Sequence, residues 1–315
     1  SIDQINDNAN VTYNGKYLVD GSHNSKVSAT TSSLTNESLA EGTKFTDLLT
    51  ALQDRNNQNL NIVQGDTITL SYVKEGSTHT TSMTVASDTK LSDIIGKFSK
   101  DLVAKTKTDS VIGKDIAGDT VNTADGGDAL TITAKGTGVD KQISGLTFSV
   151  SNSKGQVKKS VNAVLDNFSE SIRAQNEGAD NSINLQVGTK SNQSIKVGLT
   201  DMRAEALGLQ AKDGKTLNIS TKDYANAAIN VLDNAVQKAL DQQTTIGAVQ
   251  SRLEYTSSNL TTASENVQAS ESTIRDADMA KEMTNYTKNN VLMQAAQAML
   301  SQANQSSSSV LSLLQ

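Results

Sequence analysis

Several residue types are missing or scarce in this chain of 315 residues. It has no cysteine, no proline and no tryptophan, and aromatic residues make up 3% of it. Without cysteine, neither a disulfide framework nor thiol chemistry contributes to the protein. With so few aromatics, any core must consist mainly of Leu, Ile, Val and Ala, as in helical bundles. The formal net charge of −6 gives no basis for nucleic-acid binding. No stretch has the charged-then-apolar form of a cleaved secretory signal.

Candidate catalytic and metal-binding groups are equally sparse. Of the two histidines, His23 lies in a polar linker and His79 on a predicted strand, and no H-E-x-x-H or Cys/His cluster accompanies them. The sequence Gly136-Thr-Gly138 lacks the third glycine of a dinucleotide loop, and Asp125-Gly-Gly-Asp128 is more typical of a turn than of a cation site. We therefore expect no catalytic residues, no metal and no cofactor, and the protein is not expected to be an enzyme.

The dominant pattern is a heptad repeat in the last third of the chain, from Lys222 onward. One column of apolar residues recurs at intervals of seven, and a column of smaller residues follows it three positions later. This a/d spacing is typical of a helix that packs along a partner helix in a coiled coil. The residues of the expected seam are Ile246, Leu253, Leu260, Val267 and Ile274.

The segment from Val291 to Gln315 carries no charged residue. Gln, Asn and a run of four Ser interrupt it, so its apolar runs are too short for a membrane span. A helical stripe nevertheless runs through it, and its end is apolar, which favours a tail packed against other chains over a frayed end. The residues expected to act in assembly or chaperone binding are Leu292, Met299, Leu300, Val310, Leu311, Leu313 and Leu314.

The first part of the chain alternates between short elements. Helical spacing of apolar residues is seen at 2–9, and Asn14-Gly15 is typical of a two-residue hairpin turn. A Ser/Thr/Asn-rich linker follows at 22–36. Further elements predicted from alternation or spacing are strands at 60–63, 66–73, 79–86, 129–134, 145–150, 183–187 and 194–199, and a helical face at Val161, Val164, Leu165, Phe168 and Ile172.

An internal repeat lies among these elements. The segment 43–52, TKFTDLLTAL, returns at 89–98 as TKLSDIIGKF. Each copy begins with hydroxyl residues able to cap a helix and continues with apolar residues at helical spacing. Both copies are therefore predicted to be helical, and two copies are too few for a solenoid.

Several segments resemble bacterial flagellin, without a gap over roughly the last quarter of the chain. They are GAVQSR at 247–252, NL at 259–260, IRDAD at 274–278, SQANQ at 301–305 and VLSLLQ at 310–315. Nearer the amino end, further segments resemble the same family: YNGKYLVDG at 13–21, LQVG at 185–188 and DMRAEALGL at 201–209. The stretch from Ser22 to about Ala179 does not match in detail, as expected for the family's variable outer domain.

The resemblance implies an α+β fold with three parts. A long antiparallel, coiled-coil helical rod domain with β-hairpins would comprise residues 1–21 and 181–275. An α+β outer domain, residues 22–180, would be inserted into it, and residues 276–315 would form a C-terminal helical tail lining the inner tube of a filament. The resemblance also implies further helices at the amino end that this sequence does not include, so we expect a truncated form.

The function implied by the resemblance is that of a structural subunit that self-assembles into the secreted, extracellular flagellar filament for motility. The implied partners are other flagellin subunits, an export chaperone that holds the tail, and the filament cap and hook-junction proteins. A host Toll-like receptor recognises flagellins, and matching the motif residue by residue places Leu232, Val236 and Arg252 on that face. Rival interpretations are a host-facing ligand or adhesin and, less favoured by the residues, an enzyme carried in the outer domain.

Overall fold

The computed structural model describes residues 1–105, 110–276 and 278–313. They form a mixed α+β chain with antiparallel sheets and long C-terminal helices, as expected. Two compact units are present, Ser1–Ser251 and Arg252–Gln315. Within the described ranges, no helix combines the length and apolarity needed to cross a bilayer.

The first unit contains most of the elements. Its short helices are α1 (Ile2–Ala9), α2 (Leu91–Gly96) and α3 (Lys159–Leu165), with 3-10 turns η1 (Leu49–Ala51) and η2 (Val139–Lys141). Its strands are β1 (Thr12–Tyr13), β2 (Lys16–Tyr17), β3 (Ser33–Asn36), β4 (Thr67–Lys74), β5 (Ser77–Thr84), β6 (Leu102–Ala104), β7 (Val111–Lys114), β8 (Thr120–Asn122), β9 (Leu130–Ala134), β10 (Gly145–Ser151), β11 (Phe168–Ile172), β12 (Ile183–Gln186) and β13 (Ser194–Val197). The long helices are α4 (Lys222–Arg275), which begins in this unit, and α5 (Met279–Leu313).

Two antiparallel sheets supply the main hydrophobic core. One has the strand order β10-β4-β5 and the other β11-β3-β9-β6. Because successive side chains on a strand point to opposite faces, alternate apolar residues turn one face of each sheet inward. The most deeply buried of these residues, at most 1% exposed, include Leu34, Ile68, Leu70, Leu130, Ile132, Leu146 and Phe148.

A second, smaller cluster joins α1 to the start of α4. Buried Leu207, Leu209 and Val231 pack there, with Ile2 and Ile5 of α1 against them. Polar contacts fix α1 further, because Asn6 donates to the Gln210 side chain at 3.0 Å and accepts from the Ala204 amide at 2.9 Å. The helical spacing predicted at the amino end is confirmed, and it exists because this face of α1 is buried.

The predicted hairpin at Asn14-Gly15 is also confirmed. Strands β1 and β2 pair antiparallel on either side of it, and both turn residues adopt left-handed backbone angles, with φ of 54° and 75°. Asn and Gly tolerate this conformation best, which is why the dipeptide predicts such a turn. The predicted strands near 66–73, 79–86, 129–134, 145–150, 183–187 and 194–199 likewise appear, as β4, β5, β9, β10, β12 and β13.

The internal repeat gives one helix, not two. In both copies an aspartate four residues into the repeat accepts a hydrogen bond from the backbone: Lys44 donates to Asp47 at 2.7 Å, and Lys90 donates to Asp93 at 2.8 Å. The second copy continues as α2, whereas the first forms only the short turn η1. The prediction of a first helix is wrong because its backbone pairs with the second copy, where the Leu49 amide donates to the Thr89 carbonyl at 2.9 Å.

Two further predictions fail for local reasons. Residues 60–63 form no strand, because Asn61 has a left-handed φ of 57° that breaks the extended run. The helical face predicted over 161–172 ends at Leu165, and Phe168 and Ile172 lie on β11, paired with β3. A spacing of four residues suits one face of a strand as well as one face of a helix, so it could not distinguish the two.

Candidate assembly surface

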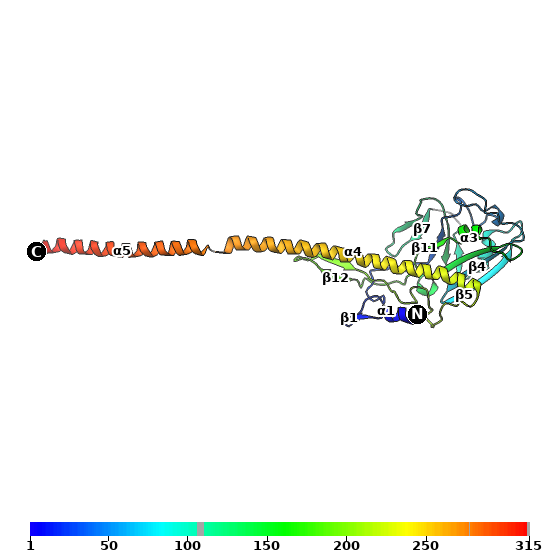
Figure 1. The fold of residues 1–315 in the computed structure, drawn as a ribbon, viewed down its shortest axis with the longest axis horizontal. Helices are drawn as coiled ribbons and strands as arrows, with labels where there is room; N and C mark the ends of the chain where they lie inside the picture. Colours follow the sequence, from blue (N-terminus) through cyan, green and yellow to red (C-terminus); the bar gives the residue numbers. More distant parts are fainter. Residues whose placement is uncertain (106–109, 277, 314–315) are drawn as a thin grey trace. The chain divides into compact units, whose positions relative to one another are not determined.

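The first part of α4 packs closely on the sheet that contains β10. Small side chains line this face of the helix, and Ala227, Ala228 and Val231 are at most 3% exposed. Gly145 of β10 permits the approach, because a Cβ atom there would lie 2.7 Å from Val231 Cγ2. Helix and strand are thus in backbone contact at this point. In Figure 1 this part of α4, drawn in yellow, lies beside β4.

A row of polar side chains extends the same face. Asn230, Asn234, Lys238 and Gln242 follow one another at intervals of four residues, which places them on one side of the helix. Lys238 and Gln242 are 5% and 7% exposed. We call these four residues the polar row. Sequence reasoning missed it, although its N-x3-N-x3-K-x3-Q spacing was visible.

Each member of the polar row contacts residues of the first unit that precede α4 in the sequence. Asn230 donates to the Leu146 carbonyl at 2.8 Å, and Asn234 donates to the Ser144 carbonyl at 2.9 Å. The Gln242 side-chain oxygen accepts from the Thr200 hydroxyl at 2.7 Å. These bonds satisfy the carbonyls of Leu146 and Ser144 and the side-chain oxygen of Gln242, whereas the buried Gln242 Nε2 has no hydrogen-bond partner among the described residues.

The remaining member forms a buried ion pair. Lys238 Nζ lies 3.3 Å from Glu170 Oε2 on β11, and both side chains are at most 6% exposed. Burial raises the pKa of the Glu170 carboxyl, against the attraction of the Lys238 ammonium, which favours its ionised form. A buried pair of this kind contributes little net stability, but removal of one partner is costly.

A second carboxyl faces α4 nearby. Asp166 accepts a hydrogen bond from the Phe148 amide at 2.7 Å. Burial raises the pKa of Asp166 to about 7, although the hydrogen bonds from Phe148 and the Asn230 side chain favour its ionised form. The joint between α4 and the sheets therefore contains a carboxyl that titrates near neutral pH.

The opposite side of this part of α4 is apolar and exposed. Ile229, Leu232, Val236 and Leu240 are between 48% and 56% exposed. Leu232 and Val236 are two of the three residues expected on a receptor-facing surface. The third, Arg252, is also exposed and lies in the second unit. Their role in receptor recognition stays a prediction.

The side chains of the expected seam are likewise not buried by other described residues. Ile246, at the end of the first unit, is 44% exposed. In the second unit Leu253 is partly exposed, and Leu260, Val267 and Ile274 are 44%, 67% and 84% exposed. None of the described residues of the second unit is buried. The partner helix that a heptad seam requires is therefore not found among the described residues, and the seam stays a prediction.

Helix α5 has no buried residue. Among the tail residues expected to act in assembly, Leu292, Met299, Leu300, Val310, Leu311 and Leu313 are between 56% and 86% exposed, and Leu314 lies outside the described residues. Asp278 initiates the helix, because its side chain accepts hydrogen bonds from the amides of Ala280 and Lys281 at 3.0 and 3.1 Å. An acid at this position also offsets the positive end of the helix dipole.

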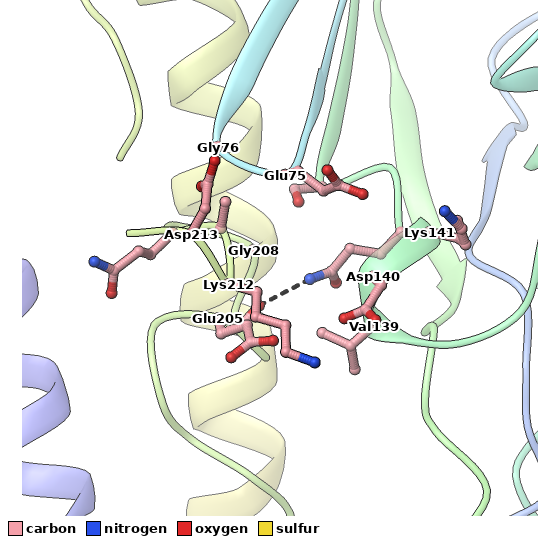
Figure 2. Close-up of a pocket in the computed structure, with 13 residues that line it drawn as sticks. Glu75, Gly76, Val139, Asp140, Lys141, Glu205, Gly208, Lys212 and Asp213 are labelled. Carbon is pink, nitrogen blue, oxygen red and sulfur yellow. Dashed lines mark hydrogen bonds between the residues drawn. The ribbon is translucent and has the colours of Figure 1, made fainter. Parts of the chain in front are cut away.

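One polar cavity of about 450 Å³ lies in the first unit, between the β4–β5 turn, η2 and the loop 205–213 (Figure 2). Charged side chains of both signs, including Glu75, Lys141 and Lys212, surround it. The side-chain nitrogen Nε2 of Gln142 donates to the backbone carbonyl of Glu205 at 2.9 Å, drawn dashed in Figure 2. No histidine lines this cavity, and no group of three metal-ligating side chains occurs in the described ranges.

Comparison with known proteins identifies the helical region. A family model described as the bacterial flagellin C-terminal helical region matches residues 229–314. The putative flagellin YvzB of Bacillus subtilis (strain 168) is 45% identical over 134 residues, which are 41% of this chain and 79% of that protein. The chain belongs to the flagellin family.

Longer flagellins are similar over a smaller share of their length. The flagellar filament 33 kDa core protein of Treponema phagedenis is 48% identical over 131 residues, 41% of this chain and 46% of that protein. The flagellin of Bacillus subtilis (strain 168) is 44% identical over 147 residues, 41% of this chain and 48% of that protein. The chain thus spans about half the length of these curated relatives. The flagellar cap protein FliD from Escherichia coli aligns over 75% of this chain and 70% of the solved chain, but a TM-score of 0.27 and 15% identity carry no argument.

The ion pair of the polar row gives a first prediction for this flagellin. Lys238→Met leaves Glu170 buried without a cation, and we expect it to lower the free energy of unfolding by about 3–5 kcal/mol at pH 8. The double variant Lys238→Met/Glu170→Gln removes both charges and should recover most of this loss. Urea unfolding of the three proteins gives the comparison. A double variant no more stable than the single one would contradict the assignment.

The titration of Asp166 gives a second prediction. Its pKa is about 7 in the folded chain and 3.8 in the ordinary, unfolded case. The folded state therefore binds more protons between these values, and this group raises the free energy of unfolding as pH falls from 8 towards 4. Asp166→Asn should be more stable than wild type by ~1–3 kcal/mol at pH 8, with the difference shrinking as pH falls.

The measurement is urea unfolding of both proteins between pH 4 and pH 8. Asp88→Asn, at an exposed carboxyl, is the matched control and should follow the wild-type pH profile. If the Asp166→Asn difference were constant across this range, the raised pKa would be wrong.

Proposed function

We propose that this chain is a structural subunit that polymerises into the bacterial flagellar filament. The observation that carries the proposal is the uncovered apolar surface of a chain in the flagellin family: the seam on α4 and the apolar side chains of α5 are exposed. Exposed Leu, Ile, Val and Met gain about 25 cal/mol for each Å² of apolar surface that neighbouring copies cover. Assembly would thus supply the burial that these helices do not find within one chain.

The three-part organisation is part of this proposal. The main core draws its residues from Leu34 to Phe168, which supports an outer domain over 22–180 with a core of its own. The smaller cluster draws on α1 and on 202–235, which supports a rod domain formed from 1–21 and 181–275. Val73 of β4 belongs to the smaller cluster, so the outer and rod parts share a packed joint. Residues 276–315 would form the inner-tube tail.

The absence of charge from Val291 onward supports the proposed position of the tail. A charged side chain buried without a partner costs several kcal/mol, whereas Ala, Gln and Ser are tolerated at closely packed helix contacts. We further propose secretion to the cell exterior, with an export chaperone, the filament cap and the hook-junction proteins as partners of the same surfaces. Leu232, Val236 and Arg252 would be the candidates for contact with a Toll-like receptor. The protein would act by assembly and not by catalysis.

The test introduces charge on the apolar stripe of α5. In the complete encoded protein, Leu292→Asp/Leu300→Asp should abolish polymerisation, because the carboxylates would be buried in the packed tail. The matched control, Gln294→Asp/Gln305→Asp, adds the same charge on the opposite side of the helix and should polymerise far better. Sedimentation and electron microscopy report filament formation, and circular dichroism checks folding. Normal filaments from the Leu292/Leu300 variant would overturn the proposal.

A further inference from the structure

Strand β5 leaves one edge of its sheet open. It follows β4 through the two-residue turn Glu75-Gly76, in which both residues have left-handed φ values of 47° and 64°. In a two-residue hairpin the residues on either side of the turn, here Lys74 and Ser77, bond to each other through their backbones. Every second cross-strand pair after them is bonded in the same way, and the backbone groups of the pairs between point away from the partner strand. Consequently the backbone groups of Thr80, Ser82 and Thr84 point away from β4. They have no backbone partner among the described residues.

The other edge of the same sheet is closed. On β10, the outward amide of Phe148 donates to the Asp166 side chain at 2.7 Å, and that of Val150 donates to the Asn162 side chain at 2.7 Å. Side chains thus already accept hydrogen bonds from the backbone N–H groups of β10 that a further strand would have to bond. Nothing comparable occurs at β5 among the described residues.

Strand β5 also lacks the residues that usually protect an open edge. Lysine, proline and inward-pointing charges normally prevent edge strands from pairing with other chains. The sequence of β5, STHTTSMT, contains none of them, although charged residues make up 20% of the chain. The hydroxyls on the exposed face of β5 already form hydrogen bonds with β4: Ser82 with Thr69 and Thr80 with Ser71, both at 2.9 Å. A copy of this strand would meet it without like-charge repulsion.

We propose that the open edge of β5 pairs antiparallel with β5 of a second copy of this chain. The start of α4 packs near Val73, which faces Thr78, and the Thr78 hydroxyl is buried, so the accessible edge runs from Thr80 to Thr84. A two-fold axis at Ser82 pairs every residue of this stretch whose backbone groups point away from β4. Ser82 then lies opposite Ser82 of the second copy, and Thr80 lies opposite Thr84 of the second copy. Two three-stranded sheets then form one continuous sheet. This contact goes beyond the proposed function, because it joins copies through the outer part and not through α4 or α5.

The lack of cysteine makes the contact testable by single substitutions. Across a two-fold axis at Ser82, the two Cα atoms of a hydrogen-bonded pair lie about 5.5 Å apart, within the range for a disulfide. The two copies of Thr84 lie four residues out of register, or roughly 13 Å apart. Both side chains are exposed and lie on the same face of the sheet. Ser82→Cys should therefore form the linked dimer at least about tenfold faster than Thr84→Cys under the same mild oxidation.

The experiment uses the full chain, with dimer measured on non-reducing gels and folding checked by urea unfolding. Adding Thr80→Lys to Ser82→Cys should slow linkage to the Thr84→Cys rate, because a lysine on an edge strand opposes its pairing with another chain. Association through α4 or α5 is common to both cysteine variants, so the ratio of their rates reports on β5 alone. Equal rates would overturn the proposal. If the cysteine variants fold poorly, sedimentation of the unmodified chain against Thr80→Lys replaces them, and equal self-association would overturn it as well.

Discussion

The packing of one face of α4 against the sheets is the interaction on which the rest of this structure depends. From Ala227 to Gln242 the helix buries small side chains together with Lys238 and Gln242 of the polar row, and beyond Gln242 no described residue of α4 is buried. Isolated helices are marginal in water, so most helical stability comes from such tertiary contacts. The first part of α4 has such contacts, whereas no described residue of α4 beyond Gln242 or of α5 is buried.

The same joint connects α4 to the sheets of the main core. Polar groups carry much of the contact: asparagine side chains bond strand carbonyls, and Lys238 meets Glu170. Hydrogen bonds of this kind fix one register of helix on sheet, because a shift by one residue would leave several buried groups without partners. A directional, hydrogen-bonded joint of this kind holds the sheets in a defined position on α4 better than apolar contact alone would.

Much of the fold could be predicted from the sequence at positions where a sequence pattern is compatible with a single structure. The Asn14-Gly15 turn, the alternating strands and the long helix over the heptads belong to this class, and family motifs identified the C-terminal region, whereas the coiled-coil seam itself stays a prediction. Prediction failed where patterns were ambiguous: the spacing of Phe168 and Ile172 suits helix and strand alike. It also failed where partners distant in sequence decide the outcome, as when the second repeat copy binds the backbone of the first. The polar row was overlooked because polar residues at intervals of four on a helix usually face solvent.

The central claim is that burial ends near Gln242 and that the helical segments beyond it are stabilised only by other copies. Hydrogen exchange of the chain in a confirmed monomeric state tests this directly. The amides of α4 between Ala227 and Gln242 should exchange slowly, with protection approaching that of the sheets. The amides from Arg252 to Arg275 and throughout α5 should exchange orders of magnitude faster. Equal protection of both regions in the monomer would contradict the account, because it would show that these helices are stable without neighbours.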